Sequence, residues 1–398
     1  MLTTRTLPSH LSIEACQALK EKLFYASDAI KTVEFEADGV LRFLLADSPE
    51  TVSVEEKIDK TIKRFVERGN PPAERIVHTE PGAQTEPHHE AIEELLHSGA
   101  ITKLGEGQFA LTGIALELLE YFDRDVRRMG ESLGAQEYRY PNIIPIQAMQ
   151  RINYLASRPE CLNFVSHLRE DVDAIDQFSA EAQTYPQEIK LGARVKTDCV
   201  NAVAVCIHTH HQWQDSDIGA DPIVIGAAGK CMRYETKNVD SLRRLRDFTM
   251  REVICIGKKE DVLDFRRRCL AVMKNRLQAW GLNSYVATAS DLFFTAEFTR
   301  LSNFQKAFGL KYEVRARLST SDDDLAIGSL NYHQDFMAKG FGIQADSVTA
   351  HSVCGAFGFE RCVYAFLTQH GLKQSNWPDA VAREVCRKEP KWTTAAKD

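Results

Sequence analysis

The sequence predicts an α+β protein, with a large antiparallel sheet flanked by helices and a small α/β unit before it. Runs rich in β-branched and aromatic residues recur through the second half of the chain with few helical segments between them, which favours an antiparallel sheet over a doubly wound parallel one. Apolar residues at helical spacing mark long helices before and among these runs. The predicted strands cover residues 200–208, 223–234, 248–256, 311–318 and 325–332.

Three long helices are predicted beside these strands. In residues 112–133 apolar positions such as Leu118 and Phe122 recur at helical spacing, and Gly134 ends the pattern, so this helix should bury one face. A short extended segment, residues 137–141, follows it and ends at a proline. The other two helices are predicted over residues 260–280 and 357–370.

A smaller unit precedes these elements. Residues 69–86 are rich in proline, glycine and polar residues, including Asn70-Pro71-Pro72, which is typical of a linker. The sequence therefore predicts an N-terminal accessory domain over residues 1–85 and a larger main domain over residues 86–398. The elements predicted in the first domain are a helix over residues 10–25, a hairpin over residues 33–45 and a helix over residues 54–68.

Composition and charge narrow the class of protein. The 398 residues are 44% hydrophobic and 26% charged, which is ordinary for a globular protein with two domains. The net charge is −7, and residues 1–90 hold 11 Lys and Arg against 16 Asp and Glu. Both observations weaken a function in which attraction to a nucleic acid backbone dominates binding. No apolar run reaches about eighteen residues, so we expect a cytoplasmic protein without membrane segments.

Ten cysteines are scattered along the chain without a CxxC pair. This spacing indicates neither a secreted disulfide framework nor a zinc ribbon, so most of these thiols should be buried in a reducing compartment. Any metal site must therefore combine ligands that lie far apart in the sequence.

The strongest local signal for chemistry is Arg233-Tyr234-Glu235, which is followed by an arginine-rich loop, residues 238–246, and a returning strand. Such a hairpin can wrap a triphosphate, because guanidinium groups are permanently charged and make paired hydrogen bonds to phosphate oxygens. A hairpin with a solvated charged loop explains the same pattern without a ligand. A second signal is the glycine-containing segment 355–361 at the start of a predicted helix, which by itself is more often a packing turn.

Together the two signals resemble motifs 2 and 3 of the class II aminoacyl-tRNA synthetases, and the helix that leads to Pro141 resembles motif 1. Cys206, the strand sequence RDFTMREVICIG, the segment SVCGAFGFERCVYAFL and the later NWP narrow the resemblance. They are similar to the zinc-dependent seryl-tRNA synthetases of methanogens and to the amino acid:[carrier protein] ligases, over about residues 105–385. The resemblance implies a homodimer that activates a small amino acid with ATP.

The resemblance also implies a zinc site. Its ligands would be Cys206, Glu252 and Cys354, and the open fourth position would accept the α-amino group of the substrate. Cys206 would in this way take part in substrate binding. A competing metal proposal uses His208, His210 and His211, because an HxH pair on a strand places both rings on one face. We favour polar packing for these histidines.

Further roles follow residue by residue from the same resemblance. Arg233 would contact the α-phosphate and the carboxylate, Glu235 the adenine amine, and Phe248 and Arg361 the two faces of the adenine ring. Arg244 and Arg251 are weaker candidates for contacts to phosphate and adenylate. Asn331 would line the substrate and magnesium site. The family carries a glutamate about three residues earlier, where this chain has Gly328, which puts a protein ligand for Mg²⁺ there in doubt.

Three functions stay open from the sequence. The favoured one transfers activated glycine, alanine or serine to the phosphopantetheine thiol of a carrier protein, which the acidic N-terminal residues and the segment LNYHQDFMAKGFGI support. The alternative charges tRNA as an atypical seryl-tRNA synthetase. The third is a non-catalytic paralogue that binds an amino acid and regulates a partner.

Overall fold

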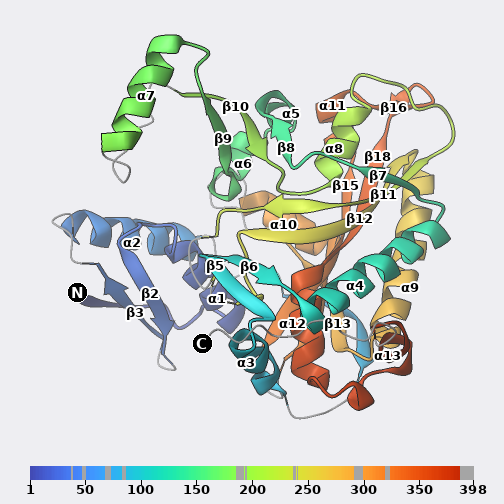
Figure 1. The fold of residues 1–398 in the computed structure, drawn as a ribbon, viewed down its shortest axis with the longest axis horizontal. Helices are drawn as coiled ribbons and strands as arrows, with labels where there is room; N and C mark the ends of the chain where they lie inside the picture. Colours follow the sequence, from blue (N-terminus) through green and yellow to red (C-terminus); the bar gives the residue numbers. More distant parts are fainter. Residues whose placement is uncertain are drawn as a thin grey trace.

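The computed structural model describes residues 1–36, 39–46, 51–67, 73–82, 87–184, 192, 195–235, 239, 241–290, 299–318 and 323–385. Within these ranges the largest sheet has eight strands, in the order β4-β13-β14-β15-β18-β12-β11-β7. Neighbouring strands are antiparallel except β7, which runs parallel to β11 at one edge. The predicted α+β class and antiparallel sheet are therefore confirmed (Figure 1).

The strands of this sheet are β4 (Ile76–Pro81), β7 (Gln136–Arg139), β11 (Ile223–Met232), β12 (Asp247–Gly257), β13 (Asn283–Ala289), β14 (Lys311–Arg317), β15 (Asp324–Gln334) and β18 (His351–Gly358). Its long helices are α4 (Gly113–Ser132), α9 (Lys259–Ala279) and α12 (Phe359–His370). Shorter elements around it are α3 (His89–His97), β5 (Ile101–Gly105), β6 (Gln108–Leu111), α10 (Thr299–Ala307), β16 (Gln344–Ala345), β17 (Val348–Thr349) and α13 (Asp379–Val385).

The three long helices cover one face of the sheet (Figure 1). The Trp280 ring meets Phe122 of α4 at 4.8 Å and Phe357 of β18 at 5.1 Å between ring centroids, both edge to face. The buried Asp125 carboxylate accepts hydrogen bonds from Trp280 Nε1 and Arg276 Nη1, each at 2.9 Å. The apolar stripe predicted in residues 112–133 is therefore the buried face of α4.

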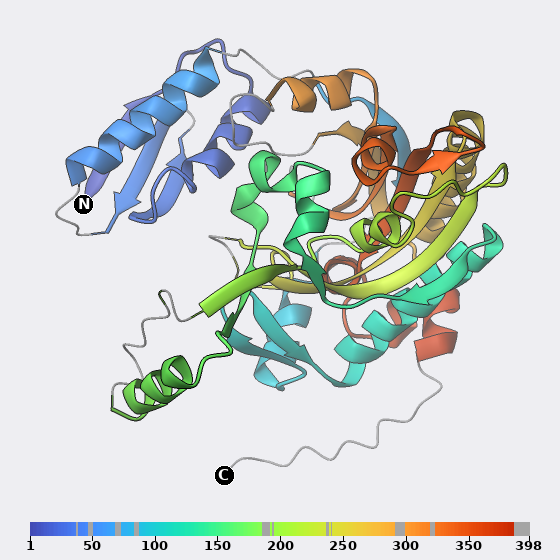
Figure 2. The same cartoon turned by 90° about the horizontal axis from the view of Figure 1, so that it is seen from above.

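The opposite face of the sheet carries a second core. Three short helices lie there, α5 (Ile146–Arg151), α8 (Cys206–Gln212) and α11 (Phe336–Phe341), and a three-stranded sheet adjoins them. That sheet has the order β8-β10-β9, with β8 (Ile143–Pro145), β9 (Phe164–Leu168) and β10 (Val195–Asn201). Helix α7 (Val172–Thr184) follows β9 and projects away from the body, without a buried residue (Figures 1 and 2).

The N-terminal unit has a core of its own. It consists of β1 (Leu2–Thr6), α1 (Ile13–Leu23), β2 (Ile30–Phe35), β3 (Val40–Leu45) and α2 (Thr51–Val66), and its sheet has the order β1-β3-β2. Leu19, Leu23 and Phe43 are fully buried in it. Figures 1 and 2 show this unit beside the main body. The division of the chain near residue 85 stays a prediction.

Two predictions about local structure are wrong. Part of the predicted linker, residues 76–81, forms strand β4, which pairs with β13 at the sheet edge; Asn70-Pro71-Pro72 lies outside the described residues. Pro81 at the strand end is compatible with such an edge. The predicted strand over residues 200–208 ends at Asn201, and α8 begins at Cys206. The apolar residues between them are buried by tertiary packing, which overrides their strand propensity.

The glycine-containing segment is also different from its prediction. Residues 351–358 form β18, at the centre of the sheet, and Gly358 is the N-cap of α12. A Cβ atom at Gly355 would lie 2.7 Å from the Cys269 sulfur, so this glycine lets α9 pack closely on the strand. Among the helices described, none combines the length and apolarity that crossing a membrane requires.

Candidate functional site

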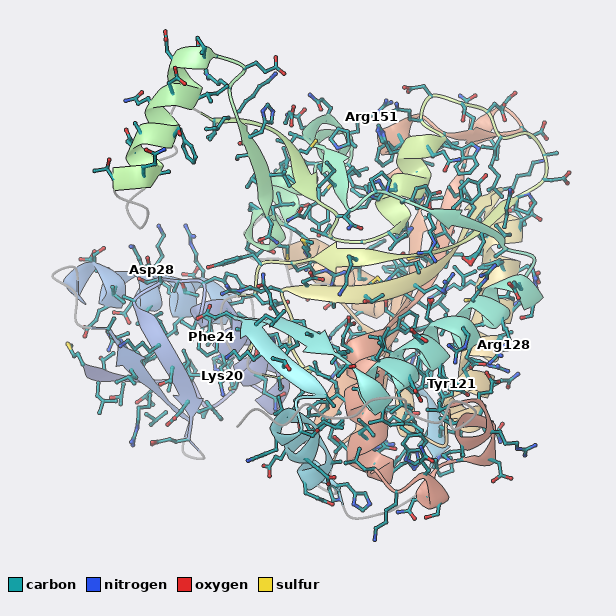
Figure 3. All side chains as sticks on the ribbon, in the orientation of Figure 1. Lys20, Phe24, Asp28, Tyr121, Arg128 and Arg151 are labelled. Carbon is teal, nitrogen blue, oxygen red and sulfur yellow. The ribbon has the colours of Figure 1, made fainter. Side chains whose placement is uncertain are left out.

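A cavity of about 880 Å³ lies on the face of the sheet opposite the long helices, and its size is typical of small-molecule sites. Strand pleating explains which side chains reach it. Phe248, Met250 and Glu252 alternate along β12 and line the cavity, whereas Arg251 and Val253 do not. Arg151, at the end of α5, also lines it. Figure 3 labels this residue on the ribbon.

Three predicted ligands meet at the floor of this cavity. Cys206 begins α8, Glu252 lies on β12, Cys354 lies on β18, and all three side chains are buried. The two sulfur atoms and a ring nitrogen of His333 lie within 4.8 Å of one another. Glu252 Oε1 accepts a hydrogen bond from the Val205 N–H at 2.8 Å, while its Oε2 is buried without a hydrogen-bond donor.

The electrostatics of this cluster favour a cation. Hydrogen bonding between the two cysteines holds the pKa of Cys354 well below its usual value and raises that of Cys206, and His333 beside Cys354 also favours the Cys354 thiolate. Burial, and then the charge on Cys354, raises the pKa of Glu252 to about 8. Two sulfurs, an unpartnered carboxylate oxygen and an imidazole form a donor set that suits zinc. The residues present therefore fit the metal that the resemblance implies.

His333 is the member of this cluster that the sequence did not assign. It lies on β15 two residues after Asn331, and both line the cavity. The two-residue period of a strand is the signal that could have found it. Asn331 lies opposite Cys354 in the strand register, and its Nδ2 lies 3.7 Å from the Cys354 sulfur.

The other end of the cavity collects the groups predicted for ATP. Arg233, Glu235, Phe248 and Arg361 all line it. The Arg233 guanidinium carbon lies 5.3 Å from the Phe248 ring centroid, and its Nε donates to the Val203 carbonyl at 2.9 Å. Arg361 donates to the Ala326 carbonyl at 3.1 Å. The fold thus brings together cationic and aromatic groups that are about 15 residues or more apart in the sequence. Such groups can contact the base and the phosphates of a nucleotide.

Arg244 lies beside this group rather than in the cavity lining. Its Nη1 pairs with Glu21 of α1 at 2.9 Å, and its Nε lies 3.8 Å from Glu235. The motif 2-like loop and the N-terminal unit are therefore joined by a salt bridge. The assignment of Arg244 to a phosphate stays a prediction.

The assignment of Arg251 to the adenylate needs correction. Its side chain points to the opposite face of the sheet, where its Nε donates to Asp123 Oδ1 at 2.7 Å and its Nη1 pairs with Glu137. Only 4% of Arg251 is exposed, so it cannot reach the cavity without breaking both pairs. Alternation along β12 separates it from Phe248 and Glu252.

We predict that Arg251→Met lowers stability and leaves the KM for ATP within about twofold. Loss of the guanidinium leaves two partly exposed carboxylates close together, which should cost about 2 kcal/mol of unfolding free energy. Urea unfolding and pyrophosphate exchange measure the two effects, with the exposed Arg267→Met on α9 as the control. A tenfold rise in KM at unchanged stability would restore the original assignment.

The histidines of α8 take no part in the cluster. His210 Nδ1 lies 2.7 Å from the Cys206 carbonyl oxygen, and the His208 ring stacks on Tyr140 at 5.5 Å between centroids. Burial lowers the pKa of His208 to about 4 and that of His210 to about 3, so both rings are neutral. The metal proposal for these histidines assumed a strand, on which both rings of an HxH pair lie on one face, but the residues lie on a helix. The third histidine, His211, forms a hydrogen bond with Gln214.

Gly328 has no room for the carboxylate that the family carries there. A Cβ atom would lie 2.7 Å from the Ala356 carbonyl oxygen and 2.8 Å from the Phe357 ring. The acid that lines the cavity nearby is Glu313 on β14, which pairs with Lys311 at 3.3 Å and Arg315 at 2.9 Å.

Comparison with known proteins finds a matching family model and several relatives. Residues 202–370 match the class II core domain of tRNA synthetases (G, H, P, S and T). The chain is 28% identical over 312 residues to amino acid–[acyl-carrier-protein] ligase 1 of Bradyrhizobium diazoefficiens, covering 77% of this chain and 91% of that protein. It is 24% identical to the type-2 serine–tRNA ligase of Methanothermobacter thermautotrophicus over 74% of this chain, but spans only 59% of that enzyme.

Solved structures show the same fold. The seryl-tRNA synthetase of Methanopyrus kandleri, in complex with A. aeolicus tRNASec, superposes with a TM-score of 0.73 at 20% identity, over 99% of this chain and 80% of that one. The cytoplasmic serine–tRNA ligase of Naegleria fowleri, in complex with AMP, gives 0.60 at 10% identity, over 86% and 73%.

Proposed function

Because the chain carries the core domain of the class II tRNA synthetases, and its relatives are ligases of that family, we propose that it activates a small amino acid with ATP and passes it to a carrier protein. The observation that carries this proposal is one cavity with nucleotide-binding groups at one end and, at the other, Cys206 and Cys354 close to each other with the buried Glu252 carboxylate interacting with both. In such a cavity the amino acid carboxylate and the α-phosphate of ATP can be held side by side.

In the first step, a carboxylate oxygen of the amino acid attacks the α-phosphorus of ATP and pyrophosphate leaves. Arg233 would hold both anionic groups and stabilise the charge that develops on the phosphoryl oxygens. Phe248 and Arg361 would hold the adenine ring, and Glu235 would accept from its amine. Cys206, Glu252 and Cys354 would hold zinc, which supplies a Lewis-acidic position for the neutral α-amine. We expect Mg²⁺ to arrive with ATP.

In the second step, the acceptor thiol attacks the acyl carbon of the adenylate and AMP leaves. A carrier protein with a phosphopantetheine thiol is the acceptor we favour, because the ligase for acyl-carrier protein is 28% identical to this chain over 91% of its own length. The excess of acidic over basic residues in residues 1–90 also disfavours electrostatic binding of tRNA by this part of the chain. Glycine, alanine and serine are the substrates we expect.

One observation keeps tRNA as the second candidate. The superposition on the M. kandleri enzyme covers 99% of this chain, so it includes the N-terminal unit. Purified protein should be incubated with Mg-ATP, labelled glycine, alanine or serine, and either holo carrier protein or total tRNA. Label on the holo carrier, released by neutral hydroxylamine and absent with the apo carrier, is expected. Label on tRNA alone would exclude the carrier proposal, and absence of amino-acid-dependent pyrophosphate exchange would favour the regulatory paralogue.

We predict that Phe248→Ala raises the KM for ATP by about 10- to 100-fold, because stacking of a base on an aromatic ring contributes about 1–3 kcal/mol. The KM for the amino acid should change much less, since Phe248 lies at the nucleotide end. Pyrophosphate exchange at varied ATP measures the effect, and the control is Phe308→Ala, at an exposed ring outside the cavity lining. Equal KM values in both variants would contradict an adenine contact at Phe248.

We also propose a homodimer, which the resemblance of residues 112–141 to motif 1 supports. Light scattering after size exclusion should give about twice the chain mass of 44.9 kDa.

A further inference from the structure

His333 stands out because its ring joins the two cysteines to a series of buried and partly buried hydrogen bonds. Its Nε2 lies 3.7 Å from the Cys354 sulfur, and its Nδ1 lies 3.0 Å from Ser352 Oγ. Ser352 Oγ lies 2.9 Å from His210 Nε2, and His210 Nδ1 lies 2.7 Å from the Cys206 carbonyl oxygen. These contacts thus connect the Cys354 sulfur, through the side chains of His333, Ser352 and His210, to the backbone carbonyl of Cys206.

Donor and acceptor roles along this series of hydrogen bonds follow from one end. A carbonyl oxygen only accepts, so His210 Nδ1 carries a proton, and in the neutral ring Nε2 is an acceptor. Ser352 must then donate its single hydroxyl proton to His210 Nε2. Its oxygen is left to accept from His333 Nδ1–H. In the neutral form of His333, the form that binds a metal ion, the lone pair is then on Nε2, the nitrogen that faces the cysteine sulfurs.

This arrangement is the one found around metal-bound histidines. A histidine ligand usually donates its second ring N–H to a polar group, which fixes the tautomer and the orientation of the ring. Here Ser352 Oγ is the polar group that accepts from the second ring nitrogen. A ring nitrogen of His333 lies within 4.8 Å of both sulfurs, a separation that a single ion between them can bridge.

We propose that His333 is a fourth protein ligand of the zinc ion in the substrate-free enzyme, with Ser352 and His210 as the groups that orient it. The inference rests on the metal site of the proposed function and changes it in one respect. Cys206, Glu252, Cys354 and His333 would then supply four protein donors, which is the usual number for a zinc ion. Binding of the α-amine of an amino acid at the metal would require His333 to move away.

X-ray absorption at the zinc edge of the full-length protein, loaded with Zn²⁺ alone, tests the proposal without any activity assay. We expect two sulfur neighbours together with the outer-shell scattering of one imidazole ring. That scattering should vanish in His333→Ala and His333→Asn and persist in His211→Ala, whose ring bonds Gln214 outside the cluster. Two sulfurs without imidazole scattering in the wild-type protein would overturn the proposal and leave the three-ligand site of the proposed function intact.

Zinc affinity provides a second measurement. Competition with a chromophoric chelator should show binding weakened about 100-fold in His333→Ala and about 10-fold in Ser352→Ala, with His211→Ala unchanged. Unchanged affinity in both His333 variants would overturn the proposal. Failure of the wild-type protein to bind Zn²⁺ at all would overturn the metal site of the proposed function as well, so the two failures are distinguishable.

Discussion

Replacement of Cys354 by serine is expected to abolish tight zinc binding and to lower kcat/KM for amino-acid-dependent pyrophosphate exchange by about 1,000-fold, or about 4 kcal/mol. The reason is the chemistry of the ligand. Hydrogen bonding to Cys206 holds the pKa of Cys354 well below its ordinary value, which favours the thiolate, the form that binds metal ions. A serine hydroxyl does not ionise there and is a much poorer zinc donor.

Metal content after dialysis and exchange kinetics with saturating Zn²⁺ measure the two effects. Cys206→Ser should behave in the same way, because it removes the other sulfur. Cys199→Ser is the matched control, since this thiol lies on β10 outside the cavity and is partly exposed. Retention of bound zinc and of activity within tenfold in both cluster variants would contradict a metal site at these residues.

The second large effect is expected at Arg233. Its replacement by alanine should lower kcat for pyrophosphate exchange by about 100- to 1,000-fold, because a preorganised donor at the developing phosphoryl charge is lost. The KM for ATP should rise less, since Phe248 and Arg361 still hold the base. Arg233→Lys should restore only part of the rate, because an ammonium group keeps the charge but cannot make two parallel hydrogen bonds.

The stability of each Arg233 variant must be measured together with its exchange kinetics, because Arg233 Nε also donates to the Val203 carbonyl. A thermal melt separates that contribution from the catalytic one. Arg267→Ala removes a largely exposed arginine from α9 and should leave exchange unchanged. A lysine variant as active as the wild type would mean that charge alone, without paired geometry, is sufficient at this position.

Much of the fold was predictable because several elements show one buried face. Helix α4 has apolar residues at helical spacing, and β11, β12, β14 and β15 are rich in strand-forming residues. Strand β18 escaped prediction because both its faces are covered and its small residues read as a turn. Helix α8 escaped it because its start is set by packing against the sheet rather than by its own residues.

Only part of the site could be predicted, because some of its residues are brought together by tertiary packing alone. Motif resemblance named eight residues that the structure brings to one cavity, which are Cys206, Arg233, Glu235, Phe248, Glu252, Asn331, Cys354 and Arg361. It also named Arg251, which the pleat of β12 turns away, and Arg244, which pairs with Glu21 of the N-terminal unit. His333 was missed because its role depends on Ser352 and His210, which come near it only in the folded chain.

The fold class and the identities of the chemical groups could be read from the sequence, because these depend on local periodicity and on residue types within short motifs. The face of β12 that each group occupies, and the donors that surround Cys354, depend on tertiary packing. Strand pairing brings Asn331 beside Cys354, and packing of α8 brings Cys206 to the same place. The distances among these three side chains depend on how the whole sheet is paired and buried, so they cannot be predicted from the sequence pattern of any one strand.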